Sequence, residues 1–252
     1  MRMKKFVCII IIVFCSFVET QGQCFGWQNQ QIGIKDNIVI PKEVLRSKLF
    51  SKFEQIAIVQ DTVTQKYGFI NLTGDVVIPC IYQEVLDFYR GLAAVQHVET
   101  KKWGYINEKN EVIIPFAYDK ATNFEHNIYN ELPGFQGLAC VNIGITDEVD
   151  RIIPDGKWGL INWDGEVILP VKYGYISPII ENMAYILDGQ RYDISNHWEI
   201  RGKMGFINQE GKIVIPPEYD FDYGAHFECG MVTLKKNGVE FKLNVQGEII
   251  NE

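Results

Sequence analysis

The sequence is short of positive charge and of long apolar runs, and each shortage excludes a class of protein. Its 252 residues contain 24 Lys and Arg against 32 Asp and Glu, which gives a net charge of −8. A nucleic-acid partner needs a basic surface opposite its phosphates, so this balance argues against one. Beyond the first twenty residues, apolar residues occur in short runs broken by Gly, Asn and Pro. That pattern excludes a polytopic membrane protein. The 47% of hydrophobic residues still suffices for a core, which argues against a disordered chain.

Signatures of catalysis and of metal binding are missing as well. The sequence has no G-x-x-x-x-G-K-[ST], H-E-x-x-H, G-x-S-x-G or G-x-G-x-x-G, and it contains only five Ser. No C-x-x-C is present and the four His are scattered, so no zinc-ligand spacing occurs. The acidic run Asp147, Glu148 and Asp150 lacks the alternation of a calcium loop and is interpreted as a solvated loop. We therefore expect no catalytic residue, no cofactor and no metal site.

The N-terminal residues have the features of a targeting segment. Three basic residues precede an almost unbroken apolar run of thirteen residues, Phe6 to Val18. A helix of that length spans about 20 Å, less than the roughly 30 Å hydrocarbon core of a bilayer. With small residues at Thr20 and Gly22, the pattern predicts a signal peptide over residues 1–22. We expect export to the periplasm, the outer membrane or the exterior, with a lipid anchor on Cys15 or Cys24 as the alternative.

Four cysteines lie beyond the predicted signal peptide, at Cys24, Cys80, Cys140 and Cys229. Outside the cytoplasm four cysteines allow two disulfides in three connectivities, and the sequence does not choose between them. Buried free thiols are the alternative, because Cys140 and Cys229 adjoin apolar segments that resemble strands.

One pattern occurs four times along the chain. Each copy opens with Lys, an aromatic residue or Met, and Gly, and a Pro follows eleven residues after that Gly. A Tyr comes three residues after the Pro, and a run of small apolar residues closes the copy. Distances of 36, 55 and 46 residues between the Gly identify a repeat array with insertions. The repeated positions are Tyr67, Gly68 and Pro79; Trp103, Gly104 and Pro115; Trp158, Gly159 and Pro170; and Met204, Gly205 and Pro216.

Each copy is predicted to contain three antiparallel strands. An Asn and a Gly or Asn three residues later, as in Asn162 to Gly165, indicate a type I turn with a bulge between the first two strands. The Pro donates no hydrogen bond and is expected to end the second strand. Gly in the first strand indicates that another segment packs on its bare backbone. The ring before it, as in Trp103 and Trp158, is expected on the opposite face, in the core between copies.

The segment from Lys102-Trp103-Gly104 through Pro115 and Tyr118-Asp119 resembles the WG repeat, which is named for its Trp-Gly dipeptide. The segment from Lys157 through Pro170 and Tyr173 resembles it too, and the likeness covers about residues 31–250. Tyr67 and Met204 depart from the Trp of this pattern, and Gly174 departs from the Asp after the Tyr. The resemblance implies an exported or envelope-associated bacterial β-repeat protein without an assigned activity. It brings no catalytic residue to this chain.

These observations predict an all-β fold in which three-stranded units of about 36 residues form an open superhelical solenoid. A closed, propeller-like ring is the alternative. The expected divisions are a signal peptide at 1–22, a degenerate capping repeat at 23–60, four repeats over 61–236 and a partial capping repeat at 237–252. The four repeats start near residues 66, 102, 157 and 203.

Insertions distinguish individual copies and provide the candidate binding surface. Residues 125–136 are inserted before a third strand, whereas 142–156 and 187–202 both follow one. Loops at the same point of successive repeats are expected on the same edge. The second loop is rich in aromatic residues and Arg, as interface cores are. Its candidate partner-binding residues are Arg191, Tyr192, His197, Trp198 and Arg201.

The function predicted from this surface is a non-catalytic binding or scaffold role in the bacterial cell envelope, with a protein or a cell-surface glycan as partner. A self-packed insert without a partner is the plainer interpretation of the same loop. The alternative function is that of a hydrolase acting on envelope polysaccharide or peptide, which needs two carboxyl groups converging within about 5–10 Å. Asp119 and Asp220, which follow the repeated Tyr, are expected to have turn or capping roles instead.

Overall fold

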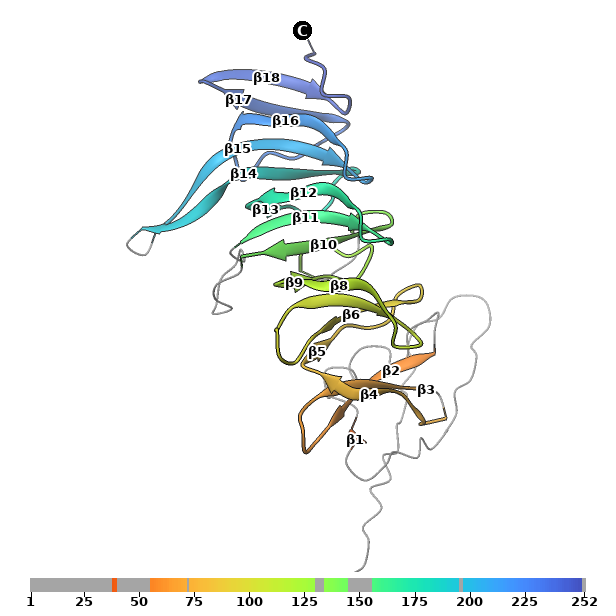
Figure 1. The fold of residues 1–252 in the computed structure, drawn as a ribbon. Helices are drawn as coiled ribbons and strands as arrows, with labels where there is room; N and C mark the ends of the chain where they lie inside the picture. The colour runs from red at the N-terminus through yellow and green to blue at the C-terminus, as the bar shows by residue number, and fades with distance from the viewer. Residues whose placement is uncertain are drawn as a thin grey trace, which may run out of the picture. The chain divides into compact units, whose positions relative to one another are not determined.

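The structure of the chain is a computed structural model that describes residues 38–39, 55–71, 73–129, 134–144, 156–194 and 197–250 (Figure 1). Within 38–39, 190–194 and 197–200 only the backbone is described. Every regular element in these ranges is a β-strand. The chain divides into two units, Met1–Tyr82 and Gln83–Glu252, which are described separately. The predicted signal peptide and Cys24 lie outside the described residues.

The first unit contains one four-stranded antiparallel sheet with its strands in chain order. The strands are β1 (Ile38–Val39), β2 (Ile56–Asp61), β3 (Tyr67–Asn71) and β4 (Val76–Tyr82). β3 carries the first Tyr-Gly pair and β4 carries Pro79. β2 lies at the end of the predicted degenerate capping repeat and pairs with β3, so this segment completes the first sheet.

The second unit contains three four-stranded sheets and one two-stranded sheet, all antiparallel, which follow one another in chain order (Figure 1). The all-β repeat array predicted from the sequence is therefore confirmed, and the described strands form no closed barrel. The strands of its four sheets are β5 (Glu84–Val85), β6 (Leu92–Gln96), β7 (Trp103–Asn107) and β8 (Val112–Tyr118); β9 (Lys120–Ala121), β10 (Leu138–Ile143), β11 (Lys157–Asn162) and β12 (Val167–Tyr173); β13 (Tyr175–Ile176), β14 (Met183–Ile194), β15 (His197–Asn208) and β16 (Ile213–Asp220); and β17 (Met231–Lys236) and β18 (Val239–Asn244).

The grouping of strands into sheets differs from the predicted three-stranded unit. The small apolar strand that closes one copy pairs with the Trp-Gly strand of the next copy, as β10 pairs with β11 through Val141 and Gly159. A two-residue strand after the repeated Tyr adds a fourth strand, as β9 does beside β10. Each complete sheet in the second unit therefore combines strands of two successive copies, and the repeats are joined by backbone hydrogen bonds as well as by side chains.

The Pro-containing strand continues past its proline, which corrects the predicted strand end. Trp103 pairs with Tyr118 and Tyr105 pairs with Ile114, so two residues of β7 span the same distance as four residues of β8. Pro115 lies in this bulge, where the interrupted ladder needs no N–H donor. The bulge covers Gly104, because a Cβ there would lie 2.6 Å from the Ile114 carbonyl oxygen. The same approach occurs at Gly68, Gly159 and Gly205.

The turn after each Trp-Gly strand has the predicted chemistry. Asn162 Oδ1 accepts hydrogen bonds from the backbone N–H groups of Asp164 at 3.1 Å and Glu166 at 2.9 Å. Gly165 N donates to the Asn162 carbonyl at 2.9 Å, and Gly165 has a φ of 81°. A positive φ at this position favours Gly or Asn. Backbone hydrogen bonds close the same turn at Asn71, Asn107, Asn208 and Asn244.

Apolar clusters fill the space between successive sheets of the second unit. Trp103 is 6% exposed and packs with Phe124, Ala139 and Val141, which belong to the following sheet or precede its strand β10. Trp158 is fully buried and contacts a cluster that extends to β13, β14 and β15. A third cluster joins the sheet containing Met204 to β17 and β18. The residue before each of these Gly therefore lies in a core between repeats.

Candidate functional site

The candidate surface lies where a small apolar strand of the second unit leads into the next Trp-Gly strand. We call this the insert edge; it comprises the junctions of β10 with β11 and of β14 with β15. At the first junction Ile143 pairs with Lys157, so residues 142–156 leave and return at neighbouring points. Residues 145–155 of this insert, with the acidic residues Asp147, Glu148 and Asp150, lie outside the described residues.

The second insert continues two strands, which corrects the prediction of a loop over Leu187–Gly202. β14 and β15 have 12 residues each, and their register is unbroken from Met183–Asn208 to Ile194–His197. We call residues 187–202 the long hairpin; Figure 1 shows it running past the ends of the neighbouring strands. Tyr, Ile and Trp favour strands, which explains why this segment extends the sheet. Gly189 and Gly202 pair within it, where the two backbones approach closely.

The register of the long hairpin divides the candidate partner-binding residues into two groups. Residues that pair directly across an antiparallel ladder share a face, and successive residues alternate. Asp193 pairs with Trp198, and Tyr192 pairs with Glu199. The candidates therefore occupy two faces: Arg191 and Trp198 on one, and Tyr192, His197 and Arg201 on the other. A partner bound to one face would engage one group and leave the other unused.

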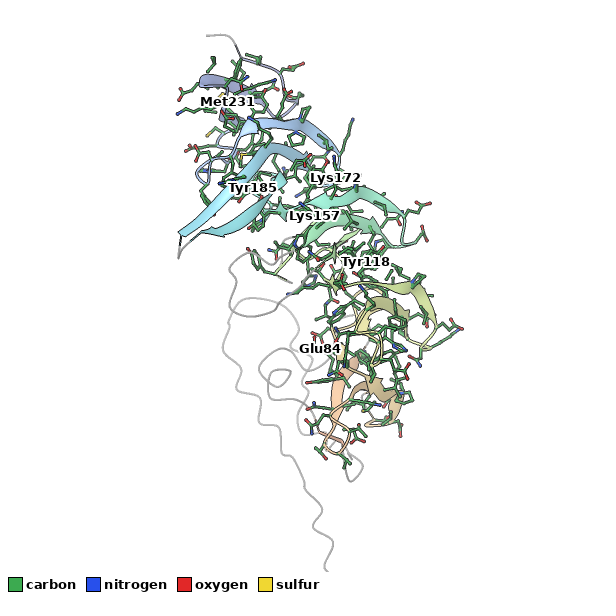
Figure 2. The ribbon with its side chains drawn as sticks, turned by 60° about the vertical axis from the view of Figure 1, so that its left-hand side comes forward. Glu84, Tyr118, Lys157, Lys172, Tyr185 and Met231 are labelled. Carbon is green, nitrogen blue, oxygen red and sulfur yellow. The ribbon has the colours of Figure 1, made fainter. Side chains whose placement is uncertain are left out.

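A hydrogen bond joins the bases of the two inserts. Lys157, which directly follows the first insert, donates from Nζ to the Gly189 carbonyl of the long hairpin at 2.9 Å. Beside it Lys172 lies 3.7 Å from the Asp188 carboxylate, with side chains about half exposed. Figure 2 labels both lysines. An exposed pair of this kind contributes little stability. The Lys157 bond shows that the two inserts start from adjacent points of the insert edge.

The repeated Asp residues take part in ion pairs. Lys102 Nζ lies 2.5 Å from Asp119 Oδ1, and Asp119 Oδ2 accepts a hydrogen bond from Gly144 N at 2.7 Å. Lys203 makes the same contact with Asp220 at 2.6 Å. The third copy has Gly174 in place of the Asp. Its lysine, Lys157, contacts the long hairpin.

These contacts keep both carboxyl groups ionised. Burial raises the pKa of Asp119, but the hydrogen bonds from Lys102 and Gly144 outweigh it, so the pKa lies below its usual value. The hydrogen bond from Lys203 is the main cause of the lowered pKa of Asp220. A carboxylate held ionised by a lysine is poorly suited to donate a proton at neutral pH. The geometry fits the structural role that the sequence suggested for these two residues.

The WG containing repeat family matches this chain at residues 67–97, 103–130, 158–192 and 204–239. These segments together cover just over half of the chain, and each starts at the residue that precedes the repeated Gly. The chain belongs to the WG containing repeat family. No curated protein matches the sequence.

The fourth WG repeat contributes to a pocket that the sequence did not indicate. It has a volume of about 140 Å³, and its lining includes Met183, Phe206 and Phe227, which are buried. Ile180 and Tyr223 also line it and are 50% and 68% exposed. We call this the aromatic pocket. The sequence signal is weak, because the residues come from three separate segments and only the fold shows which of them remain exposed.

The cysteines of the WG repeats are unpaired where the structure describes them. Cys80, Cys140 and Cys229 are free, so no disulfide forms among these three residues, and of the two thiols expected to be buried Cys140 is buried whereas Cys229 is exposed. Burial raises the pKa of the Cys140 thiol to about 12, which keeps it protonated and inert. In the described parts of the chain, three or more His, Cys, Asp or Glu residues never gather as a metal site would require. Those parts also lack a helix of the length and apolar character needed to span a membrane.

Proposed function

We propose that this WG repeat protein is a non-catalytic binding or scaffold protein of the bacterial cell envelope and that its long hairpin is the surface that binds the partner. The observation that carries the proposal is the length of β14 and β15, 12 residues each, against five or six in the corresponding strands of the second unit. Among the side chains that the structure describes on β14, the last one in an inter-repeat core is Leu187. The predicted signal peptide supports the envelope location.

A protein partner suits this hairpin better than a glycan. A two-stranded ribbon has two edges, and a partner strand can hydrogen-bond to either of them. The hairpin also carries Tyr192, Trp198 and two Arg, residue types that are enriched in the centres of protein interfaces. The hydrogen bond from Lys157 Nζ to the Gly189 carbonyl places the base of the first insert next to this hairpin.

A shortened hairpin tests the proposal. Gly189 and Gly202 pair directly, so replacing residues 190–201 by Asn-Gly leaves a two-residue turn that the remaining strands can accept. The intact chain and this variant are used as baits in envelope extract, with quantitative mass spectrometry and a circular dichroism check of the fold. We expect the variant to lose the specifically retained proteins. Equal retention by a folded variant would contradict the proposal, as would turnover of envelope polysaccharide or peptide by the chain.

Two matched variants locate the binding face. One combines Tyr192→Ala, His197→Ala and Arg201→Ala, and the other combines Arg191→Ala and Trp198→Ala. Because the two groups occupy opposite faces, we expect one variant to reduce binding about tenfold or more while the other retains it. A glycan array screened in parallel tests the other class of partner. A glycan that binds the intact chain but not the shortened-hairpin variant would show that the partner is a glycan and not a protein. Equal binding by both variants would contradict a single binding face.

A further inference from the structure

We infer that the aromatic pocket binds an aromatic side chain of a partner polypeptide and that an adjoining acidic hollow holds a basic residue next to that side chain. This site goes beyond the proposed function. Met183, in the aromatic pocket, pairs with Asn208 at one end of β14, whereas the long hairpin lies at the other end, where Ile194 pairs with His197. Figure 2 labels Tyr185 on β14 and Met231 on β17, which line the pocket and the hollow respectively.

The size and floor of the aromatic pocket fit one ring. Its volume of about 140 Å³ is close to the roughly 150 Å³ at which an engineered apolar protein cavity binds benzene. Met183, Phe206 and Phe227 are at most 4% exposed, and the two phenyl rings meet edge to face with centroids 5.1 Å apart. Aromatic edges and a thioether sulfur both make favourable contacts with an additional ring. The pocket therefore favours an aromatic side chain.

Two polar groups of the aromatic pocket, the hydroxyls of Ser177 and Tyr175, are already paired, which disfavours a sugar. Ser177 Oγ accepts a hydrogen bond from Tyr185 N and donates one to the Pro178 carbonyl, both at 2.9 Å. The Tyr175 hydroxyl lies 3.1 Å from the hydroxyl of Tyr129. A sugar entering the pocket would lose hydrogen bonds to water without gaining equivalent ones from these groups. An aromatic hydrocarbon ring has no such hydrogen bonds to lose.

The rim of the aromatic pocket is apolar and exposed. Ile180 and Tyr223 are 50% and 68% exposed, and the Tyr223 ring contacts Phe221 edge to face at 4.8 Å. A ligand that fills the pocket would also cover these two side chains. An anchor inserted into a buried floor, surrounded by contacts that exclude water, is the arrangement found at the centres of protein interfaces.

The adjoining acidic hollow supplies charge complementarity. This open hollow of about 490 Å³ shares Ala225 and His226 with the aromatic pocket, so the two are contiguous. Its lining contains the carboxylates of Asp222 and Glu228 together with two basic residues, Lys242 and His226. The chain as a whole carries a net charge of −8. A lysine or arginine next to the aromatic anchor would be attracted here, whereas an acidic residue would be repelled.

Three methionines make the inference measurable by NMR of the intact chain labelled with ¹³C at the methionine methyl groups. Met183 lines the aromatic pocket and Met231 lines the acidic hollow. Met204 is fully buried and lines neither, so it reports on the fold. The probes are N-acetyl-Phe-Lys-amide, N-acetyl-Ala-Lys-amide, N-acetyl-Phe-Glu-amide and N-acetylglucosamine. The three signals are assigned with single variants, each of which removes one of them: Met183→Leu, Met204→Leu and Met231→Leu.

We expect the Phe-Lys probe to shift the Met183 and Met231 signals saturably and to leave Met204 unchanged. The Ala-Lys probe is expected to bind at least about tenfold more weakly, because it lacks the ring, and the Phe-Glu probe about two- to fivefold more weakly, because of its charge. No saturable shift with any probe would overturn the inference. A Met183 response to N-acetylglucosamine that matches or exceeds that of the Phe-Lys probe would overturn it too, as would equal binding of the Ala-Lys probe.

Rim variants separate pocket binding from other effects. Tyr223→Ala and Ile180→Ala are each expected to weaken Phe-Lys binding about threefold or more while the Met204 signal keeps its position. The matched control is Ile113→Ala, an isoleucine that is 41% exposed on β8 and lies outside both linings. Equal binding by the rim variants would overturn the inference. The shortened-hairpin variant should bind this probe like the intact chain, so failure here and failure of the proposed function are distinguishable.

Discussion

At the scale of single residues, the Trp-Gly pair makes two contacts on opposite faces of one strand. Trp158 is fully buried in a cluster between two sheets. The next residue, Gly159, lies under the bulge of the Pro-containing strand, where a Cβ would be 2.5 Å from the Leu169 carbonyl oxygen. Successive side chains of a strand point to opposite faces. The Trp therefore packs between neighbouring sheets, while the Gly leaves room on the other face for the bulge of its own hairpin. Each contact predicts a different effect of substitution.

Replacing Trp158 by Ala should destabilise the protein by about 3–5 kcal/mol, because it leaves a large cavity between two sheets. Urea denaturation followed by circular dichroism measures the loss. Trp158→Phe should cost less, since it keeps a ring and removes an indole N–H that has no hydrogen-bond partner among the described residues. A loss below about 1 kcal/mol for the Ala variant would show that the ring is not a core residue.

Gly104→Ala should cost about 2–3 kcal/mol, because the added methyl group would overlap the backbone of β8. The matched control is Gly224→Ala, where the added Cβ would meet its nearest neighbour at an ordinary 3.4 Å. Thermal unfolding of both variants measures the difference. Equal midpoints for the two variants would mean that the bulge can shift away from the strand at little cost.

At the scale of elements, the Trp-Gly strand of each complete sheet in the second unit is paired on both sides, and in two of these sheets an ion pair ties it to the end of the Pro-containing strand. β7 lies between β6 and β8. Lys102 directly precedes β7 and Asp119 directly follows β8, so their ion pair closes the open end of this hairpin. Lys203 and Asp220 close the hairpin of β15 and β16 in the same way.

Asp119→Asn should lower stability at pH 7 by up to about 1 kcal/mol, the value of a partly exposed ion pair. The pKa of Asp119 is lower in the folded state than its usual value of 3.8. Its contribution is therefore present above that value and is lost as the pH falls through the lower folded-state pKa. Denaturation curves at pH 7 and pH 3 should show the two proteins converging in acid. Asp188→Asn, which removes a longer and more exposed pair, is the control. A difference that grows in acid would contradict this assignment.

At the scale of the whole molecule, the second unit is a linear series of sheets joined by separate clusters. One cluster joins the first and second sheets, another joins the second and third, and a third joins the last two. Each of these clusters joins two successive sheets, as in other repeat proteins. Stability is then expected to vary along the series and not to be shared equally.

Phe227→Ala should loosen one end of the second unit and leave the other end unchanged. Phe227 is 1% exposed in the cluster between the last two sheets, and it contacts Phe206 edge to face. Hydrogen exchange should become faster in β15, β17 and β18, whereas β6 and β7 should keep their protection. Val239→Ala, at a side chain that is 56% exposed, is the control and should change neither. Equal acceleration in all strands would show that the unit unfolds as one cooperative body.

The sequence alone determined the repeated parts of this protein. Trp103, Trp158 and the Gly after each indicated strands with one buried face, and Asn162 with Gly165 indicated the turn that the structure contains. These features follow from local chemistry: alternation along a strand, the positive φ of Gly, and the hydrogen bonds that an Asn side chain makes to its own turn. Because the pattern recurs in four copies with few substitutions, the resemblance to WG repeats is also visible from the sequence.

Only the tertiary structure decided which segments meet. The pairing of β10 with β11 joins two successive repeats across an insert, and the bulge at Pro115 depends on the register between two strands. The sequence predicts a loop over 187–202, and the structure has the long hairpin there because its two strands are set by pairing with each other and not by the repeat pattern. The aromatic pocket combines Met183, Phe206 and Phe227 from three segments. Pairing and burial depend on contacts between residues far apart in the chain, and no local pattern encodes them.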